Sequence, residues 1–203
     1  MPTNKSKTAK IISVTNQKGG VGKTTTTINL AAALSELEKK VLIIDLDPQG
    51  NASTGLGVEV ADRELSTYEF LVEGVPLEKV AMETEISGLS IVPATIDLSS
   101  ADIDLISNEK RSHLLHEALR KKQENKQKYD YILIDCPPSL NILTVNAMVA
   151  SHSVLIPLQS EFFALEGLSQ LLLTVKEVRQ TANENLRVEG IVLTMFDGRN
   201  NLS

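Results

Sequence analysis

A glycine-rich loop between an apolar run and a helix-like segment constrains this chain more than any other feature. The loop spans residues 17–25 and reads Gln-Lys-Gly-Gly-Val-Gly-Lys-Thr-Thr. Its glycines let the backbone curl tightly and turn N–H groups toward an anion, and a helix that begins there adds the positive end of its dipole. Strand, glycine loop, Lys-Thr and helix in this order are typical of a phosphate-binding P-loop.

The side chains of this loop suit a nucleotide with its magnesium ion. Lys23 can reach the terminal phosphates as a point charge, and the Thr24 hydroxyl can ligate Mg²⁺. The loop departs from the usual G-x-x-x-x-G-K-[ST] pattern, because Gln17 stands at the first position and a second lysine, Lys18, follows it. We expect these loop residues to bind the nucleotide: Gly19, Gly20, Val21, Gly22, Lys23, Thr24 and Thr25.

Apolar runs alternate with segments of helical periodicity along most of the chain. The alternation predicts an α/β fold of the P-loop NTPase type, with a mostly parallel β-sheet flanked by helices on both faces. We expect a disordered lead-in at residues 1–9 and a single P-loop ATPase domain over residues 10–203, with residues 53–62 as a loop. The expected strands cover residues 10–15, 41–44, 89–92, 129–135, 153–158 and 188–193, and the expected helices cover residues 25–37, 65–72, 98–106, 111–126, 143–150 and 164–179.

The bulk composition excludes several classes of protein. The 203 residues are 42% hydrophobic, which is enough for one sizeable core, and they include neither a signal-peptide pattern nor an apolar run of membrane-spanning length. A single cysteine, Cys136, rules out an intrachain disulfide and a four-cysteine metal site, and it fits a reducing, cytoplasmic setting. With a net charge of −6, any binding of nucleic acid needs a local basic patch or an assembly.

Aspartates end two of the expected strands, at the edge where parallel sheets place their ligands. Asp135 follows an apolar run, and an aspartate there holds Mg²⁺ opposite the loop threonine in P-loop enzymes. Asp45 and Asp47 follow another run and are candidates for orienting the attacking water. Spacing leaves open which of the two faces the γ-phosphate, and an Asx turn before Pro48 is the alternative for both.

Several motifs together resemble the ParA (Soj-like) partition proteins of the ParA/MinD class of ATPases. Residues 18–25, Lys-Gly-Gly-Val-Gly-Lys-Thr-Thr, match the deviant Walker A motif of that class, and residues 45–51, Asp-Leu-Asp-Pro-Gln-Gly-Asn, resemble its second motif. Residues 135–139 are similar to its Walker B and switch II segments. Residues 161–167 and 194–197 also resemble ParA segments, so the likeness runs from about Lys10 to the end of the chain.

The resemblance implies a role for each residue. Lys18 corresponds to the signature lysine that reaches the nucleotide of a partner subunit, where it acts like an arginine finger. Lys23 is the phosphate lysine within its own subunit and Thr24 the Mg²⁺ ligand, while Asp47 activates water and Asp45 lies next to the metal. ATP then favours a homodimer that binds nonspecific double-stranded DNA, and hydrolysis releases it. The implied ATPase is weak alone, stimulated by a centromere-binding ParB-like partner, cytoplasmic, nucleoid-associated and not bound to membrane.

Two alternatives share the loop chemistry. A MinD-like, membrane-cycling ATPase for division-site placement needs a basic amphipathic C-terminal helix, which this sequence lacks. A nucleotide-switched DNA-binding regulator with little turnover would differ in its measured ATPase rate. A nitrogenase-iron-protein-like reductase is excluded in its cluster-bearing form, because one cysteine per subunit cannot supply half of a four-cysteine cluster.

Two departures affect the expected DNA binding. ParA proteins continue beyond the point where this chain ends, and we expect the absent part to carry a further strand, the adenine contacts and much of the basic surface. Residues 109–128 hold seven basic and three acidic residues. This stretch is read either as a solvated helix face or as a contributor to nonspecific phosphate contacts.

Overall fold

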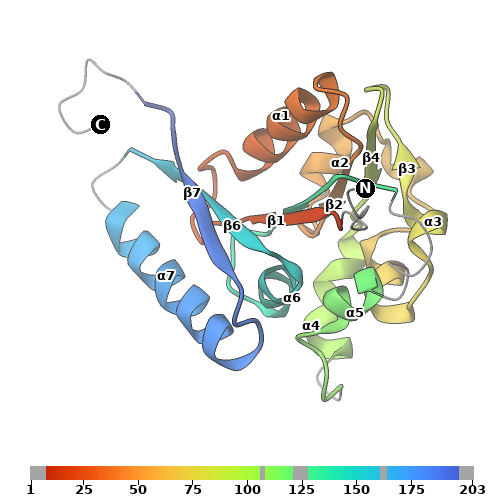
Figure 1. Ribbon diagram of the computed structural model, residues 1–203. Helices are drawn as coiled ribbons and strands as arrows, with labels where there is room; N and C mark the ends of the chain where they lie inside the picture. Colours follow the sequence, from red (N-terminus) through yellow and green to blue (C-terminus); the bar gives the residue numbers. More distant parts are fainter. Residues whose placement is uncertain (1–7, 106–107, 121–127, 161–163, 197–203) are drawn as a thin grey trace, which may run out of the picture.

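A seven-stranded sheet forms the centre of the computed structural model, which describes residues 8–105, 108–120, 128–160 and 164–196 (Figure 1). The strands lie in the order β3-β4-β2-β5-β1-β6-β7, and every neighbouring pair is parallel except β3 with β4. The predicted α/β class with a mostly parallel sheet is therefore confirmed. The strands are β1 Lys10–Val14, β2 Val41–Asp45, β3 Met82–Glu83, β4 Leu89–Val92, β5 Tyr131–Asp135, β6 Ser153–Gln159 and β7 Arg187–Thr194.

Helices cover both faces of the sheet (Figure 1). Helices α1 and α2 pack on one face, against side chains such as Ile43 and Leu133, while α5 and α6 pack on the other, against Leu42 and Ile134. Neighbouring residues in a strand point to opposite faces, so each continuous apolar run supplies both cores. The helices are α1 Lys23–Glu36, α2 Asn51–Gly55, α3 Leu77–Val80, α4 Ala101–Asp104, α5 Leu114–Arg120, α6 Ile142–Ala150 and α7 Ala164–Thr181.

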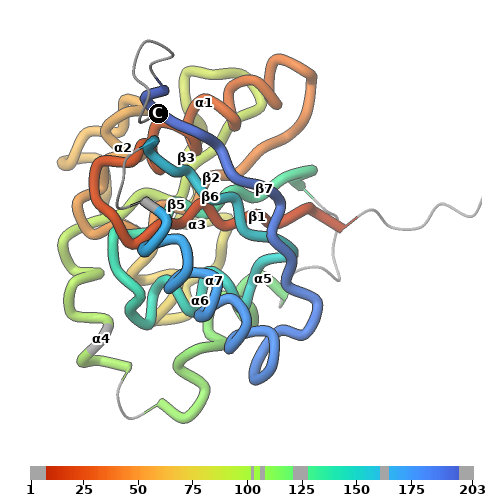
Figure 2. Tube along the Cα trace, turned by 90° about the vertical axis from the view of Figure 1, so that its left-hand side faces the viewer, coloured from red at the N-terminus to blue at the C-terminus, as the bar shows by residue number. Residues whose placement is uncertain are grey.

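The strand order brings the expected ligand-binding residues to one edge. β1 lies between β5 and β6, and β5 lies between β1 and β2. In register, Asp135 is the partner of both Val14 and Asp45, so three strands end side by side. Figure 2 shows the loop before α1 and helix α2 on the same side of the molecule, opposite the start of β1.

All six expected strands are present, but the short strand β3 and the short helices α2 and α3 were not predicted. The two-residue strand β3 at the sheet edge is too short to show an alternating pattern. The first three residues of the expected loop at 53–62 belong to helix α2, Asn51–Gly55, and its last three form a 3₁₀ turn, Val60–Asp62. Helix α2 begins after Gly50, which has a left-handed backbone conformation. In the first turn of this helix the N–H of Ser53 donates to the carboxylate of Asp45, which lies eight residues before Ser53. Local periodicity cannot reveal a cap supplied from another element.

Other predicted helices changed their bounds or type. The segment expected at residues 65–72 contains a π-helix, Glu69–Glu73, and its entry is fixed by Ser66, whose N–H and hydroxyl both donate to the Glu69 carboxylate. The segment expected at residues 98–106 splits into a 3₁₀ helix, Ile96–Ser100, and α4. Of the helix expected at residues 111–126, α5 covers Leu114–Arg120, and residues 121–127 lie outside the described ranges. In the described ranges, no helix is both long and apolar enough to cross a membrane.

Candidate nucleotide-binding site

The glycine loop joins β1 to α1 at the carboxyl edge of the sheet. Gly20 and Gly22 have φ angles of +74° and +81°, in the left-handed region that favours glycine, and Gly22 is the residue from which α1 begins. Among the described residues, no side chain caps this helix end. Because the first N–H groups of a helix have no partner within it, the loop and the start of α1 present donors and a positive dipole end to an anion.

Lys23 is buried at the base of this loop. Its Nζ donates to the backbone oxygen of Lys18 at 2.9 Å, across the loop. Burial lowers the pKa of the Lys23 ammonium, and the negative charges of Asp135 and Asp47 act in the opposite direction. Both aspartates are therefore near enough to act on the charge of Lys23, and a phosphate oxygen would offer the lysine a stronger, charged acceptor than a carbonyl.

Asp135 is fully buried at the end of β5 and has one oxygen without a partner. The Thr27 hydroxyl donates to Oδ1 at 3.2 Å, whereas Oδ2 has no hydrogen-bond partner among the described residues. Burial, together with the charge of Asp45, raises the pKa of Asp135 to about 7, although hydroxyl groups of Thr24 and Thr27 act against the shift. An orphaned buried carboxylate oxygen beside a threonine hydroxyl suits Mg²⁺, which takes one or two carboxylates together with waters and phosphate oxygens.

Asp45 is fully buried, and both of its carboxylate oxygens accept hydrogen bonds from protein groups. Its Oδ2 accepts the N–H and the hydroxyl of Ser53, at 2.9 and 2.7 Å, and its Oδ1 accepts the N–H of Asp47 at 3.2 Å. Burial raises the pKa of Asp45 to about 6 despite these hydrogen bonds. Both oxygens are thus engaged in shaping the segment that follows β2, which includes the Asx-type turn considered as the alternative.

Asp47 is also buried, with one oxygen engaged in a turn. Its Oδ1 accepts the N–H of Gln49 at 3.0 Å, and its backbone oxygen accepts the N–H of Gly50 at 2.8 Å. No hydrogen bond to Oδ2 is recorded within the described ranges. In each aspartate, therefore, one carboxylate oxygen takes part in an Asx turn, as the alternative reading expected. In Asp47 the second oxygen can accept a further hydrogen bond.

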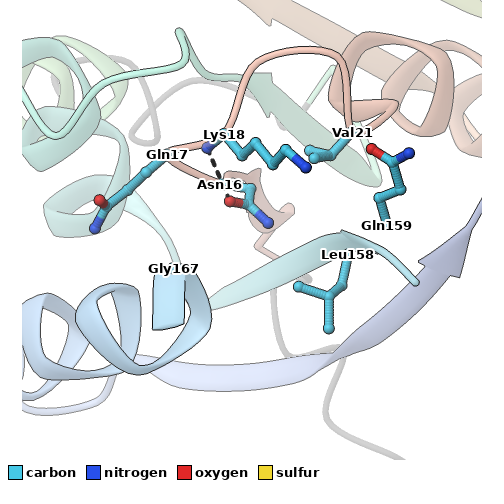
Figure 3. Close-up of a pocket in the computed structure, with 7 residues that line it drawn as sticks. All are labelled: Asn16, Gln17, Lys18, Val21, Leu158, Gln159 and Gly167. Carbon is cyan, nitrogen blue, oxygen red and sulfur yellow. Dashed lines mark hydrogen bonds between the residues drawn. The ribbon is translucent and has the colours of Figure 1, made fainter. Parts of the chain in front are cut away.

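Lys18 lies on the exposed rim of the loop, beside a cavity of about 250 Å³ (Figure 3). Its N–H donates to the side-chain oxygen of Asn16 at 3.0 Å, and Figure 3 shows its side chain running alongside the loop toward Val21. The far wall of the cavity comes from the end of β6, with Leu158 and Gln159, and from Gly167 on α7. The two loop lysines thus occupy different positions, since Lys23 is buried under the loop and Lys18 lies on its outer edge.

Comparison with known proteins identifies the family. A family model described as an AAA domain matches residues 9–188. The sporulation initiation inhibitor protein Soj of Bacillus subtilis is 52% identical over 193 residues, which cover 95% of this chain and 75% of the relative. The chromosome partitioning protein ParA of Caulobacter vibrioides is 51% identical over 194 residues, covering 96% of this chain and 72% of that one. The chain belongs to the ParA/Soj family.

A solved structure similar to this ParA/Soj chain contains a nucleotide. It is a cobyrinic acid a,c-diamide synthase from Mycobacterium smegmatis with a bound ATP analogue and magnesium. The TM-score is 0.89 at 38% sequence identity, over 95% of this chain and 75% of the other. The similarity supports the P-loop NTPase fold already evident from the order of the strands.

Three supporting residues of the ParA/Soj site were not singled out from the sequence. Thr27 lies one helical turn after Thr24 and donates to Asp135, so the Thr-x-x-Thr spacing could have suggested it. Asn16 donates to the backbone oxygen of Pro157 at 2.7 Å and thereby ties the loop to β6. Thr194, at the end of β7, donates to the backbone oxygen of Val21 at 2.9 Å. The last two contacts span 141 and 173 residues of sequence, and no local pattern signals them.

The remaining residues noted in the sequence stay outside this site or outside the described ranges. Cys136 is buried beside Asp135, and burial raises the pKa of its thiol above the usual range, which suits a packing role. No group of three His, Cys, Asp or Glu residues that could hold a metal occurs in the described part of the chain. Residues 161–163 and Asp197, from the ParA-like segments, are not described.

Burial of Asp135 predicts a pH dependence of stability. Its folded pKa of about 7 exceeds the ordinary value of 3.8, so between these values the folded chain holds a proton that the unfolded chain has released. Without metal or nucleotide, we expect this group to lower the free energy of unfolding as pH rises from about 4 to 7, by about 1.4 kcal/mol per pH unit at most.

Urea unfolding with EDTA at a series of pH values measures this dependence. Asp135→Asn keeps the size of the side chain and removes its charge, so its stability should fall less over this range and exceed that of the natural chain near pH 8. An equal slope in the two proteins would show that Asp135 does not titrate as its burial implies.

Proposed function

We propose that this chain is an Mg²⁺- and ATP-dependent partition ATPase whose nucleotide site is completed by a second copy of the chain. The observation that carries the proposal is the convergence of Lys23, Asp47 and Asp135 at one sheet edge, in a chain about 50% identical to proteins named as chromosome partitioning proteins. The charges of both aspartates act on Lys23, as expected for groups that share one phosphate and metal site.

Within one subunit, each group has a distinct role. The loop N–H groups and the start of α1 bind the phosphates, and Lys23 exchanges the Lys18 oxygen for a phosphate oxygen. Thr24 and the orphaned oxygen of Asp135 would hold Mg²⁺, directly or through water, and the ion would neutralise charge on the β- and γ-phosphates. Asp47 accepts a hydrogen bond from the attacking water through Oδ2 and orients it.

The hydrogen bonds of Asp45 favour an indirect role near the metal ion over direct coordination of the ion. Both of its oxygens already accept protein donors, and these hydrogen bonds hold the backbone between Asp45 and Ser53 in place. We therefore propose that Asp45 lies near the ion and contributes charge, while Asp135 supplies the oxygen that faces it.

Lys18 is suited to act on the nucleotide of a partner subunit. It is exposed on the outer edge of the loop, while Lys23 already serves the phosphates from below. A lysine that crosses to the partner makes ATP part of the dimer interface, so ATP binding favours the dimer and hydrolysis releases it. The cavity between Lys18 and the end of β6 leaves room at this surface for groups of the second copy.

Membership of the ParA/Soj family supports a proposal about DNA and protein partners. We propose that the ATP-bound dimer binds nonspecific double-stranded DNA, associates with the nucleoid, and is stimulated by a centromere-binding ParB-like partner. In the basic stretch of residues 109–128, Arg111, Arg120 and Lys128 are exposed, while Lys110 forms an ion pair with Glu117 at 3.0 Å. The similar solved structure named as a synthase shares 38% identity, against 51% and 52% for ParA and Soj, so sequence favours partition over amide synthesis.

Phosphate release in the presence of Mg²⁺ tests this function. We expect slow ATP turnover by the chain alone and a several-fold increase when DNA and the ParB-like partner are both added. The Lys23→Ala chain serves as the blank for contaminating ATPases. A rate that equals this blank under every condition would contradict the proposed activity.

A further inference from the structure

We propose that Arg63 is a positioning residue that holds the Asp47 loop, defined as residues 45–51, in the geometry needed for hydrolysis. The proposal rests on the ATPase function proposed above. Arg63 is only 8% exposed, its guanidinium lies against Gly50 in the Asp47 loop, and its hydrogen bonds go to Thr54, Val58 and Ala94. It would act through Gly50 and Ala94 without touching the nucleotide.

The environment of Arg63 is unusual for a buried cation. Its Nη1 donates to the backbone oxygen of Ala94 at 3.0 Å, and its Nη2 donates to the backbone oxygen of Val58 and the hydroxyl of Thr54, at 2.7 and 2.8 Å. Its Nε also donates to the oxygen of Val58, at 3.3 Å. Every one of these acceptors is neutral. Burial of a guanidinium without a carboxylate is costly, and such departures from packing rules are expected near functional sites.

The guanidinium lies directly against the end of the Asp47 loop. Gly50 has a φ of +64°, and a Cβ built on it would lie 2.2 Å from Nη1 of Arg63 and 3.0 Å from the oxygen of Ala94. The N–H of Gly50 closes the turn by donating to the oxygen of Asp47, and its own oxygen accepts the N–H of Thr54 in α2. Arg63 therefore supports Gly50 from behind and also binds the helix that follows it.

Ala94 connects this support to the other end of the loop. Its oxygen accepts Arg63, while its N–H donates to the hydroxyl of Ser53 at 3.0 Å. That hydroxyl donates in turn to Asp45 at 2.7 Å. The backbone just beyond β4 thus anchors both flanks of the loop, Asp45 directly through Ser53 and Gly50 through Arg63. Loss of the Arg63 anchor would free the Gly50 side, three residues from the carboxylate of Asp47.

This arrangement predicts a selective effect on the chemical step. In Arg63→Lys, a single ammonium replaces the planar fork and cannot reach all three acceptors. We expect kcat to fall about tenfold or more, since small displacements of a reacting group have effects of this size. The Kd for ATP should stay unchanged, because none of the recorded Arg63 hydrogen bonds reaches the glycine loop. Arg179→Lys, at an exposed position of α7, is the matched control.

A double-mutant cycle with Gly50 isolates the contact. Gly50→Ala places a methyl group where Nη1 of Arg63 lies, so it should displace the guanidinium and lower kcat by a similar factor. In an Arg63→Ala background the clash with Nη1 is absent, so the same substitution should lower kcat by a smaller factor, which reports the positive φ of Gly50 and the nearby Ala94 oxygen. Millimolar guanidinium should restore part of the kcat of Arg63→Ala alone. If Arg63→Ala does not fold, Thr54→Val removes one acceptor and should lower kcat in the same direction.

Amide hydrogen exchange keeps this test separate from the proposed function. The N–H groups of Gln49 and Gly50, which bond to Asp47, should exchange faster in Arg63→Lys even if no turnover is measured in any variant. Faster exchange with lower kcat and unchanged Kd supports the positioning role. Unchanged exchange, or equal losses of ATP affinity and kcat, overturns it.

Discussion

Asp47→Asn is expected to lower ATP turnover about a hundredfold or more while leaving ATP binding intact. The side-chain oxygen of asparagine can still accept the N–H of Gln49, so the 3.0 Å hydrogen bond that forms the turn is retained. The amide that replaces Oδ2 can no longer accept a proton or a strong hydrogen bond from water. The substitution therefore removes the proposed chemistry and keeps the local backbone.

Phosphate release and fluorescent-nucleotide binding measure the two parts of this prediction. The Asn variant discriminates between the two roles considered for Asp47, because a residue that served only as an Asx-turn former would tolerate asparagine. Asp97→Asn, at an exposed carboxylate far from the loop in sequence, is the control for loss of charge alone. Turnover close to that of the natural chain in Asp47→Asn would contradict the water-orienting role.

Lys18→Ala is expected to abolish ATP-dependent dimerisation and to lower turnover about a thousandfold, the scale found for cations supplied across an interface. Its binding of ATP as a monomer should remain, because the buried Lys23 and the loop N–H groups are unchanged. Light scattering with and without ATP follows the dimer, and Lys79→Ala at an exposed position is the control. A Lys18→Ala protein that dimerises normally on addition of ATP would rule out the role.

The sequence predicted the sheet, and it marked the residues of the candidate site, because both signals are local. Strands β2 and β5 contain continuous apolar runs, and the glycine loop and strand-end aspartates mark the carboxyl edge without any knowledge of tertiary contacts. Register then brought Asp45 and Asp135 to neighbouring strands, as a parallel sheet requires. The resemblance to ParA proteins assigned Asp47 where spacing alone left two candidates.

What the sequence could not predict depends on long-range contacts. Helix α2 begins after Gly50, which adopts a positive φ, and Asp45 accepts the N–H of Ser53 in its first turn, so the first residues of a segment expected as loop are helical. The same contacts engage both oxygens of Asp45 and favour a structural role over the metal-facing one. The support from Arg63 joins residues up to 31 positions apart, and no periodic pattern reports it.

Subunit mixing tests the central claim, a nucleotide site shared between two copies of the chain. In a mixed dimer of Lys18→Ala and Asp47→Ala subunits, one site keeps its own Asp47 and receives Lys18 from the partner, while the other site lacks both. An equal mixture should recover turnover well above that of either variant alone, up to about a quarter of the natural value, which is the limit for random pairing because half of the dimers are then mixed and each has one working site. The mixed dimer has one Lys18 contact in place of two, so the recovered fraction should lie below this limit and rise with protein concentration. If Lys18 acts within its own subunit, both sites of the mixed dimer are defective, and the mixture will stay as inactive as either variant alone.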